Sequence, residues 1–194
     1  MKNEESSSGQ SLLEFAIILP LVLALVLGVI EVGYALLDQH VVTKVARESS
    51  NLISRNTNLG DAATAMGTMS TRPLNFAPGG VSKLIFSVVR KGTTTGSNNF
   101  NQDILYQRYV LGSSNLSNPS ALTTPGGSFG PGPEYTANNA DSDAGLRVSG
   151  LPANLVAPGG IVYITEIYTR HTLITPFDRL GVTVPSVLYS IAYF

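Results

Sequence analysis

The chain has 194 residues, which is enough for one membrane-spanning segment and a single modest domain but too few for two domains of ordinary size. Its formal net charge is -1 and only 13% of its residues are charged, so no basic surface favours nucleic acid as a partner. The sequence contains no cysteine, which excludes disulfides, thiol catalysis and cysteine-based zinc sites.

The first predicted element is a hydrophobic helix. Every residue from Phe15 to Ile30 is apolar, glycine or proline. Because an α-helix rises about 1.5 Å per residue, about 20 residues cross the roughly 30 Å hydrocarbon layer of a bilayer. We therefore predict a transmembrane helix over residues 10–37, in which Pro20 is tolerated although it lacks a backbone N–H.

Two carboxylates flank the apolar core of this segment. An ionisable group at such a place costs on the order of 1–3 kcal/mol. We interpret Glu31 as an interfacial residue whose carboxylate reaches the headgroups. At the other end, cleavage after Gly9 would make Gln10 the N-terminus, and its α-amine would need a negative partner in a region of low dielectric. Glu14, four residues further on, can pair with that amine in its own chain or in a neighbour.

These residues resemble a known motif. Gly9, four intervening residues, Glu14 and Phe15 directly before an apolar run are similar to the prepilin-peptidase motif of type IV pilins and pseudopilins. The stretch GQSLLEFAIILPLVLALVLGVIEVGYAL, residues 9–36, resembles the TadE-like minor pilins of tight-adherence (Tad) pilus systems. The resemblance includes Pro20 and covers about the first quarter of the chain.

The resemblance implies a set of functional expectations. Residues 1–9 would be a leader that a prepilin peptidase removes between Gly9 and Gln10. The protein would cross the bacterial inner membrane once, with its N-terminus cytoplasmic and its C-terminal domain exported. Glu14 would act in assembly through amine pairing, while Phe15 and Pro20 would belong to the motif and to helix packing. The implied partners are the peptidase, other pilins and pseudopilins, the inner-membrane assembly platform and the membrane, and the implied role is pilus assembly, surface adhesion or priming.

Two other interpretations remain open. An uncleaved anchor starting at Met1 would hold an envelope binding module at the membrane. Alternatively, Gly33-Tyr34-Ala35 provides a small-x-small site at which a signal peptidase could release a secreted protein beginning with Leu36. The first residue of the mature protein distinguishes the three interpretations.

The hydrophobic segment continues into an amphipathic stretch. Apolar residues recur every three to four positions from Tyr34 through Leu37, Val41 and Val45 to Ile53. This periodicity predicts that the helix continues over residues 38–60 and packs this stripe on the chain's own domain. A short helix is expected over residues 61–70.

Residues 61–194 are predicted to form the exported domain. The segments APGGVSKLIFSVVR (77–90) and APGGIVYITEIYTR (157–170) each combine a Pro-Gly turn with a β-branched and aromatic run, which predicts a strand. Residues 104–111 and 184–194 are further strand candidates. The predicted fold class is α+β, with the long N-terminal helix packed on a small antiparallel β-sheet.

The stretch 112–160 is rich in Gly, Pro, Ser and Asn, so we expect a long surface loop of limited order that buries little. Within it, Asn139, Asp141 and Asp143 alternate as calcium ligands do, although the following glycine and glutamate positions of an EF-hand are not met. His40 and His171 lack a partner pattern and are interpreted as solvated or capping residues. With no catalytic motif, we expect no enzyme activity and no cofactor.

Overall fold

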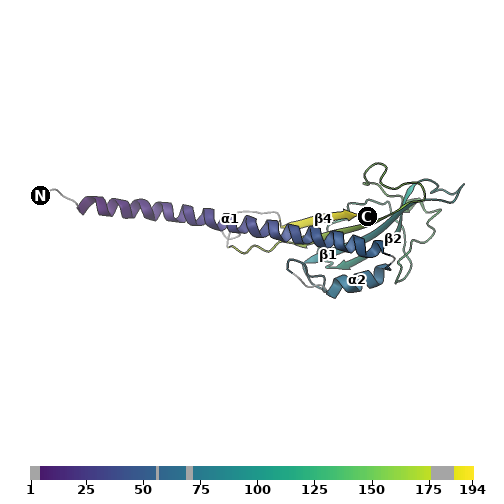
Figure 1. Ribbon diagram of the computed structural model, residues 1–194, viewed down its shortest axis with the longest axis horizontal. Helices are drawn as coiled ribbons and strands as arrows, with labels where there is room; N and C mark the ends of the chain where they lie inside the picture. The colour runs from purple at the N-terminus through teal and green to yellow at the C-terminus, as the bar shows by residue number, and fades with distance from the viewer. Residues whose placement is uncertain (1–4, 56, 69–71, 176–185) are drawn as a thin grey trace. The chain divides into compact units, whose positions relative to one another are not determined.

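The computed structural model describes residues 5–55, 57–68, 72–175 and 186–194. Its elements in chain order are α1 (Glu5–Ser54), α2 (Leu59–Thr68), β1 (Ser82–Lys91), β2 (Asp103–Gly112), the 3-10 turn η1 (Ala144–Leu146), β3 (Ile161–Arg170) and β4 (Val187–Tyr193) (Figure 1). The chain divides into two compact units, Met1–Leu37 with Thr172–Val184 and Asp38–His171 with Pro185–Phe194. The predicted α+β class is confirmed.

The first unit contains the apolar part of α1. Its large side chains are exposed in succession from Leu12 to Leu37, and the helix continues through Pro20. Among the described residues, α1 is the one helix that is long and apolar enough to cross a membrane. An uninterrupted apolar helix surface of this length is stable in lipid or against other apolar helices, because in water it would be left unburied.

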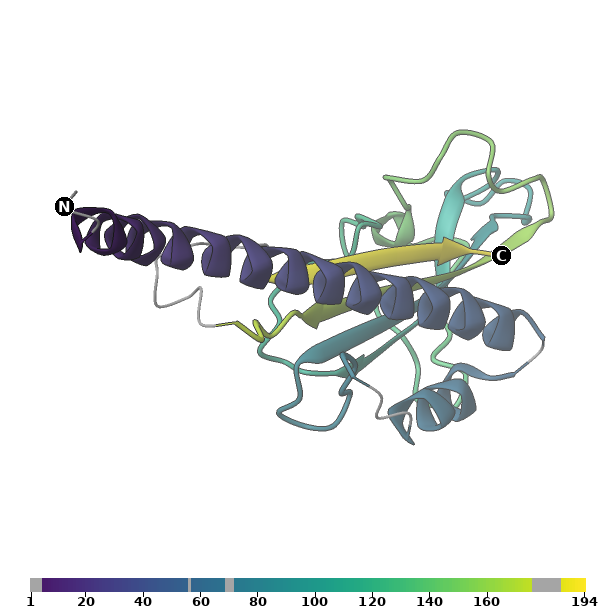
Figure 2. The ribbon, with the colours of Figure 1, turned by 60° about the vertical axis from the view of Figure 1, so that its left-hand side comes forward.

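The second unit is built on a four-stranded antiparallel sheet with the strand order β2-β1-β3-β4 (Figure 2). The two similar segments of the sequence form its central pair, β1 and β3. Each begins with the same turn, in which Gly80 N donates to Ala77 O and Gly160 N donates to Ala157 O, both at 2.8 Å. Gly79 and Gly159 adopt positive φ in these turns, as the Pro-Gly pairs predict.

One face of the sheet is covered by helices. Val42, Val45, Ala46 and Ile53 of α1 are buried in one cluster with α2 and with Phe86 of β1. The amphipathic stripe is thus confirmed from Val42 onward, whereas Tyr34 and Leu37 remain 43% and 57% exposed.

The amphipathic helix is also shorter than the predicted range 38–60. The Asn58 side chain accepts from Asp61 N at 2.8 Å and so caps a second helix, α2, at its N-terminal end. The chain therefore leaves α1 after Ser54 instead of prolonging it.

The opposite face of the sheet is covered by the 112–160 segment, and the expectation that this segment buries little was wrong. Its buried apolar residues are Leu116, Leu122, Ala137, Leu146 and Val156. Leu122 and Val156 pack against Val89 and Ile164, which point away from the helical face because successive side chains alternate across a strand. Scattered single apolar residues therefore build a second core layer within a loop whose average composition is polar.

Candidate functional site

The predicted processing site lies in the first turns of α1. Gly9 and Gln10 are exposed, and the Gln10 side-chain amide donates to the Glu14 carboxylate at 3.1 Å. Residues four apart lie on the same face of a helix, so Gln10 and Glu14 are brought together by the backbone itself. The Glu14 carboxylate is consequently directed toward the turn that contains the predicted cleavage bond.

The surroundings of this site are open. A Cβ added to Gly9 would meet no atom within 4 Å. Phe15 is 62% exposed, and Pro20 lies on an equally exposed stretch of the helix. The predicted site residues thus share one exposed segment of α1, which is accessible to a peptidase or to other helices.

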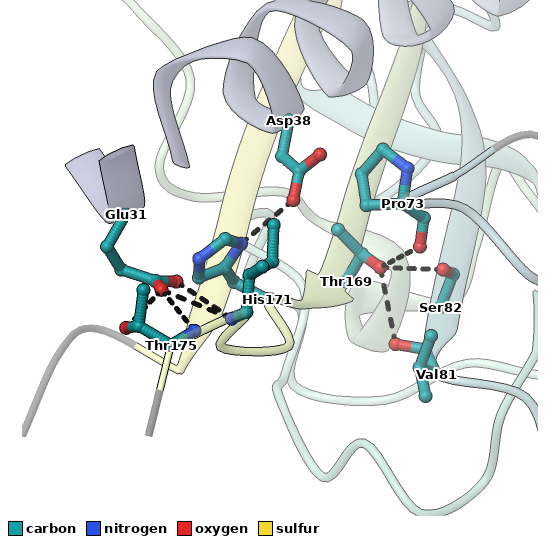
Figure 3. A network of polar contacts seen from close by, with 9 residues as sticks. Glu31, Asp38, Pro73, Val81, Ser82, Thr169, His171 and Thr175 are labelled. Carbon is teal, nitrogen blue, oxygen red and sulfur yellow. Dashed lines mark hydrogen bonds and ion pairs between the residues drawn. The ribbon is translucent and has the colours of Figure 1, made fainter. Parts of the chain in front are cut away.

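Glu31 differs from its predicted role. Its side chain does not reach outward to headgroups, since it is only 3% exposed. Its carboxylate accepts hydrogen bonds from Ile174 and Thr175, which follow β3 in the chain (Figure 3). The backbone N–H of Ile174 donates at 3.1 Å, and that of Thr175 at 2.9 Å, to one carboxylate oxygen, and the Thr175 hydroxyl donates to the same oxygen at 2.6 Å. The prediction that the carboxylate reaches the headgroups was therefore wrong, and the sequence could not indicate its partners because they lie 143 and 144 residues away.

His171 was also misinterpreted as solvated or capping. Its Nδ1 lies 2.8 Å from Asp38 Oδ2, and both side chains are buried (Figure 3). Gln39 next to Asp38 donates to Tyr189 O at 3.0 Å. These contacts fix α1 against β4 and the end of β3 within the second unit. His40, by contrast, is exposed on α1.

A second buried carboxylate, Glu166 of β3, connects the sheet to the 112–160 segment. It is fully buried and accepts from Ala121 N at 2.7 Å, from the Tyr189 hydroxyl at 3.2 Å and from the Ser120 hydroxyl. Burial, and then the Glu166 charge, raise the pKa of the Tyr189 phenol. Burial lowers the pKa of the Arg108 guanidinium, which the Glu166 charge partly offsets.

The sequence contained a signal for such buried polar groups. Glu166 interrupts a strand of β-branched and aromatic residues, IVYITEIY, and a charged side chain in the centre of a two-sided strand must find partners on one of the covered faces. Two of its partners, Ser120 and Ala121, could not be identified because they lie in the loop that was expected to bury little.

The Asn139, Asp141 and Asp143 alternation has a structural role in the loop. The buried Asn99 amide donates to Ala140 O and Asp143 O, both at 2.8 Å. The Asp143 carboxylate accepts from Gly145 N at 2.8 Å and caps η1. Among the residues that the structure describes, no group of three or more His, Cys, Asp or Glu side chains is placed to hold a metal ion.

Comparison with known families addresses the N-terminal segment. A family model described as TadE-like protein matches residues 9–50. This segment is TadE-like. The resemblance drawn from Gly9, Glu14 and Phe15 is therefore confirmed for this segment. The TadE-like segment contains the whole apolar part of α1 and most of its amphipathic part. Neither the curated proteins nor the solved structures include a match to this chain.

Proposed function

We propose that the chain is a minor pilin or pseudopilin of a Tad-type pilus, cleaved between Gly9 and Gln10 by a prepilin peptidase. The observation that carries this proposal is the TadE-like match, which begins at Gly9 itself and extends along the exposed apolar helix. The match thus starts at the residue before the proposed cleavage bond and leaves residues 1–8 of the leader outside.

The environment of Gly9 supports the same proposal. A glycine inside a helix costs up to about 1 kcal/mol relative to alanine, so it is retained where space or backbone conformation requires it. Gly9 is helical and has open space around its Cα, so the fold of this chain does not require a glycine there. We propose that the binding site of the peptidase imposes this glycine; because Gly33 has equally open surroundings, variants at both positions are needed to test the proposal.

Glu14 is proposed to act after cleavage. The new α-amine of Gln10 would lie at the positive end of the helix dipole, one turn before the Glu14 carboxylate. In a low-dielectric environment this amine pairs with Glu14 of its own chain or, as we propose, of a neighbouring subunit. Moving an apolar helix from lipid into a bundle of apolar helices is nearly neutral in hydrophobic free energy, so this pairing would set the register of the subunits.

We propose a structural role for the protein in the membrane and the pilus. The one long apolar helix among the described residues suits an inner-membrane protein that crosses the bilayer once, with a cytoplasmic leader and an exported domain. From there the protein would enter the pilus or its inner-membrane assembly platform, where the domain acts in assembly, adhesion or priming.

The test is to determine the first residue of the protein isolated from membranes that contain the native prepilin peptidase. The proposal predicts Gln10. A chain beginning with Met1 would be an uncleaved anchored module, and a chain beginning with Leu36 would be a secreted protein, so either result would contradict the proposal.

A matched pair of glycine variants sharpens this test. Neither Gly9 nor Gly33 has an atom within 4 Å of an added Cβ, so valine at either position is tolerated sterically in this chain. Gly9→Val should leave the leader in place, while Gly33→Val should be cut normally. The opposite pattern would indicate signal peptidase cleavage after Ala35.

A further inference from the structure

The buried carboxylate of Glu31 lies among exposed apolar side chains. Glu31 is 3% exposed, yet Val29 and Val32 beside it on α1 are 73% and 57% exposed. Ile174, whose backbone N–H donates to Glu31, is 44% exposed. Glu31 and the segment Thr172–Thr175 belong to the same compact unit. The apolar surface of α1 thus continues onto a short non-helical segment that is fastened to the helix by its carboxylate.

We propose that the segment Thr172–Thr175 is a second membrane-contacting element, held on α1 by Glu31 and covered by lipid at the end of the span that leads into the folded domain. The proposal rests on the membrane anchoring included in the proposed function. It assigns Glu31 as the positioning residue of this element and Ile174 as the side chain that enters the bilayer.

The hydrogen bonds of Glu31 make this location physically possible. Irregular backbone is tolerated at membrane depth only where its polar groups are satisfied within the protein. The N–H groups of Ile174 and Thr175 and the Thr175 hydroxyl all donate to the Glu31 carboxylate. The same contacts supply the carboxylate with donors that water would otherwise provide, which lowers the cost of burying its charge.

We favour lipid over a protein partner as the cover of Ile174, because Ile174 continues the exposed apolar surface of α1. The exposed apolar residues on either side of Glu31 belong to the one surface that begins at Leu12 and ends at Leu37, and Ile174 extends it. This surface is the part of α1 with the length and hydropathy of a membrane span. A bilayer that covers Val29 and Val32 therefore also meets Ile174.

The experiment uses the full chain in phosphatidylcholine vesicles and exploits its lack of tryptophan. Single variants Ile174→Trp, Val26→Trp and Phe100→Trp place one fluorophore on the proposed element, deeper on α1 and on the folded domain, all at positions at least 44% exposed. Lipids brominated near the headgroup or deep in the acyl chain then quench the fluorophore according to its depth. We expect loss of fluorescence for Ile174→Trp mainly with the shallow bromines, for Val26→Trp with the deep bromines, and for Phe100→Trp with neither.

Combination with Glu31→Ala tests the positioning role. Removing the carboxylate should release the segment and abolish the quenching of Ile174→Trp, while Glu48→Ala, at an exposed carboxylate of the same helix, should leave it unchanged. Quenching of Ile174→Trp that survives Glu31→Ala would overturn this assignment.

The two proposals fail in distinguishable ways. Quenching of Val26→Trp without quenching of Ile174→Trp would overturn the further inference and leave the membrane anchoring intact. Absence of quenching at Val26 would instead contradict the membrane anchoring on which the inference depends.

Discussion

Replacing Glu166 by alanine should strongly destabilise the folded domain. The Glu166 side chain is fully buried and accepts from Ala121 N and from the Tyr189 and Ser120 hydroxyls. A buried donor left without an acceptor costs about 1–3 kcal/mol, and removing one partner from a buried charged network typically costs about 3–5 kcal/mol. We therefore expect Glu166→Ala to lower the free energy of unfolding by about 3–5 kcal/mol, a large share of the roughly 5–15 kcal/mol of an ordinary protein.

The assay is urea unfolding of the full chain in detergent, followed by tyrosine fluorescence. Glu134→Ala is the matched control, because its carboxylate is exposed and accepts from the Gln107 amide at 3.0 Å, so its loss should stay within about 0.5 kcal/mol. Glu166→Gln retains a carbonyl oxygen that can accept from Ala121 N, so its loss of unfolding free energy should lie between those of Glu166→Ala and Glu134→Ala. A Glu166→Ala protein as stable as Glu134→Ala would refute the assignment of Glu166 as the connection between the sheet and the 112–160 segment.

Three further outcomes are expected. Leu122→Ala should lower the free energy of unfolding by about 2–5 kcal/mol in urea, because Leu122 is 2% exposed and packs on Val89; a loss typical of a surface site would show that the segment is not part of the core. The pKa of Tyr189 is raised in the folded protein, so the contribution of Tyr189 to stability is intact below the pKa of about 10 in the unfolded chain and is lost as the pH rises above it. Tyr189→Phe should therefore flatten the decline of the free energy of unfolding measured at alkaline pH, and an unchanged decline would contradict this. Glu14→Gln should still yield a chain beginning with Gln10 but should reduce recovery in pili, and normal assembly would count against amine pairing.

The elements of this fold were predictable where the sequence is locally periodic. The APGG turns and the β-branched runs after them specify β1 and β3 through backbone preferences alone. The spacing from Val42 to Ile53 likewise marks the buried face of α1, since a 3.6-residue period needs no knowledge of the partner surface.

Contacts between distant segments could not be predicted in this way. Asp38 and His171 are 133 residues apart, and neither has a local pattern that indicates the other. The covered second face of the sheet did have a signal, because the run LIFSVV in β1 is apolar at every position except Ser87 instead of alternating, as is typical of a strand buried on both sides. The average composition of residues 112–160 obscured that signal, since a few well-placed leucines and valines suffice to cover the face.

The central proposal, that this chain with its TadE-like segment is a prepilin peptidase substrate, is tested most directly by the intact mass of the protein from membranes with and without the peptidase. We predict that the mass falls by that of residues 1–9 only when the peptidase is present, leaving Gln10 as the first residue. An identical mass in both membranes, or a chain shortened to Leu36 in both, would contradict the account.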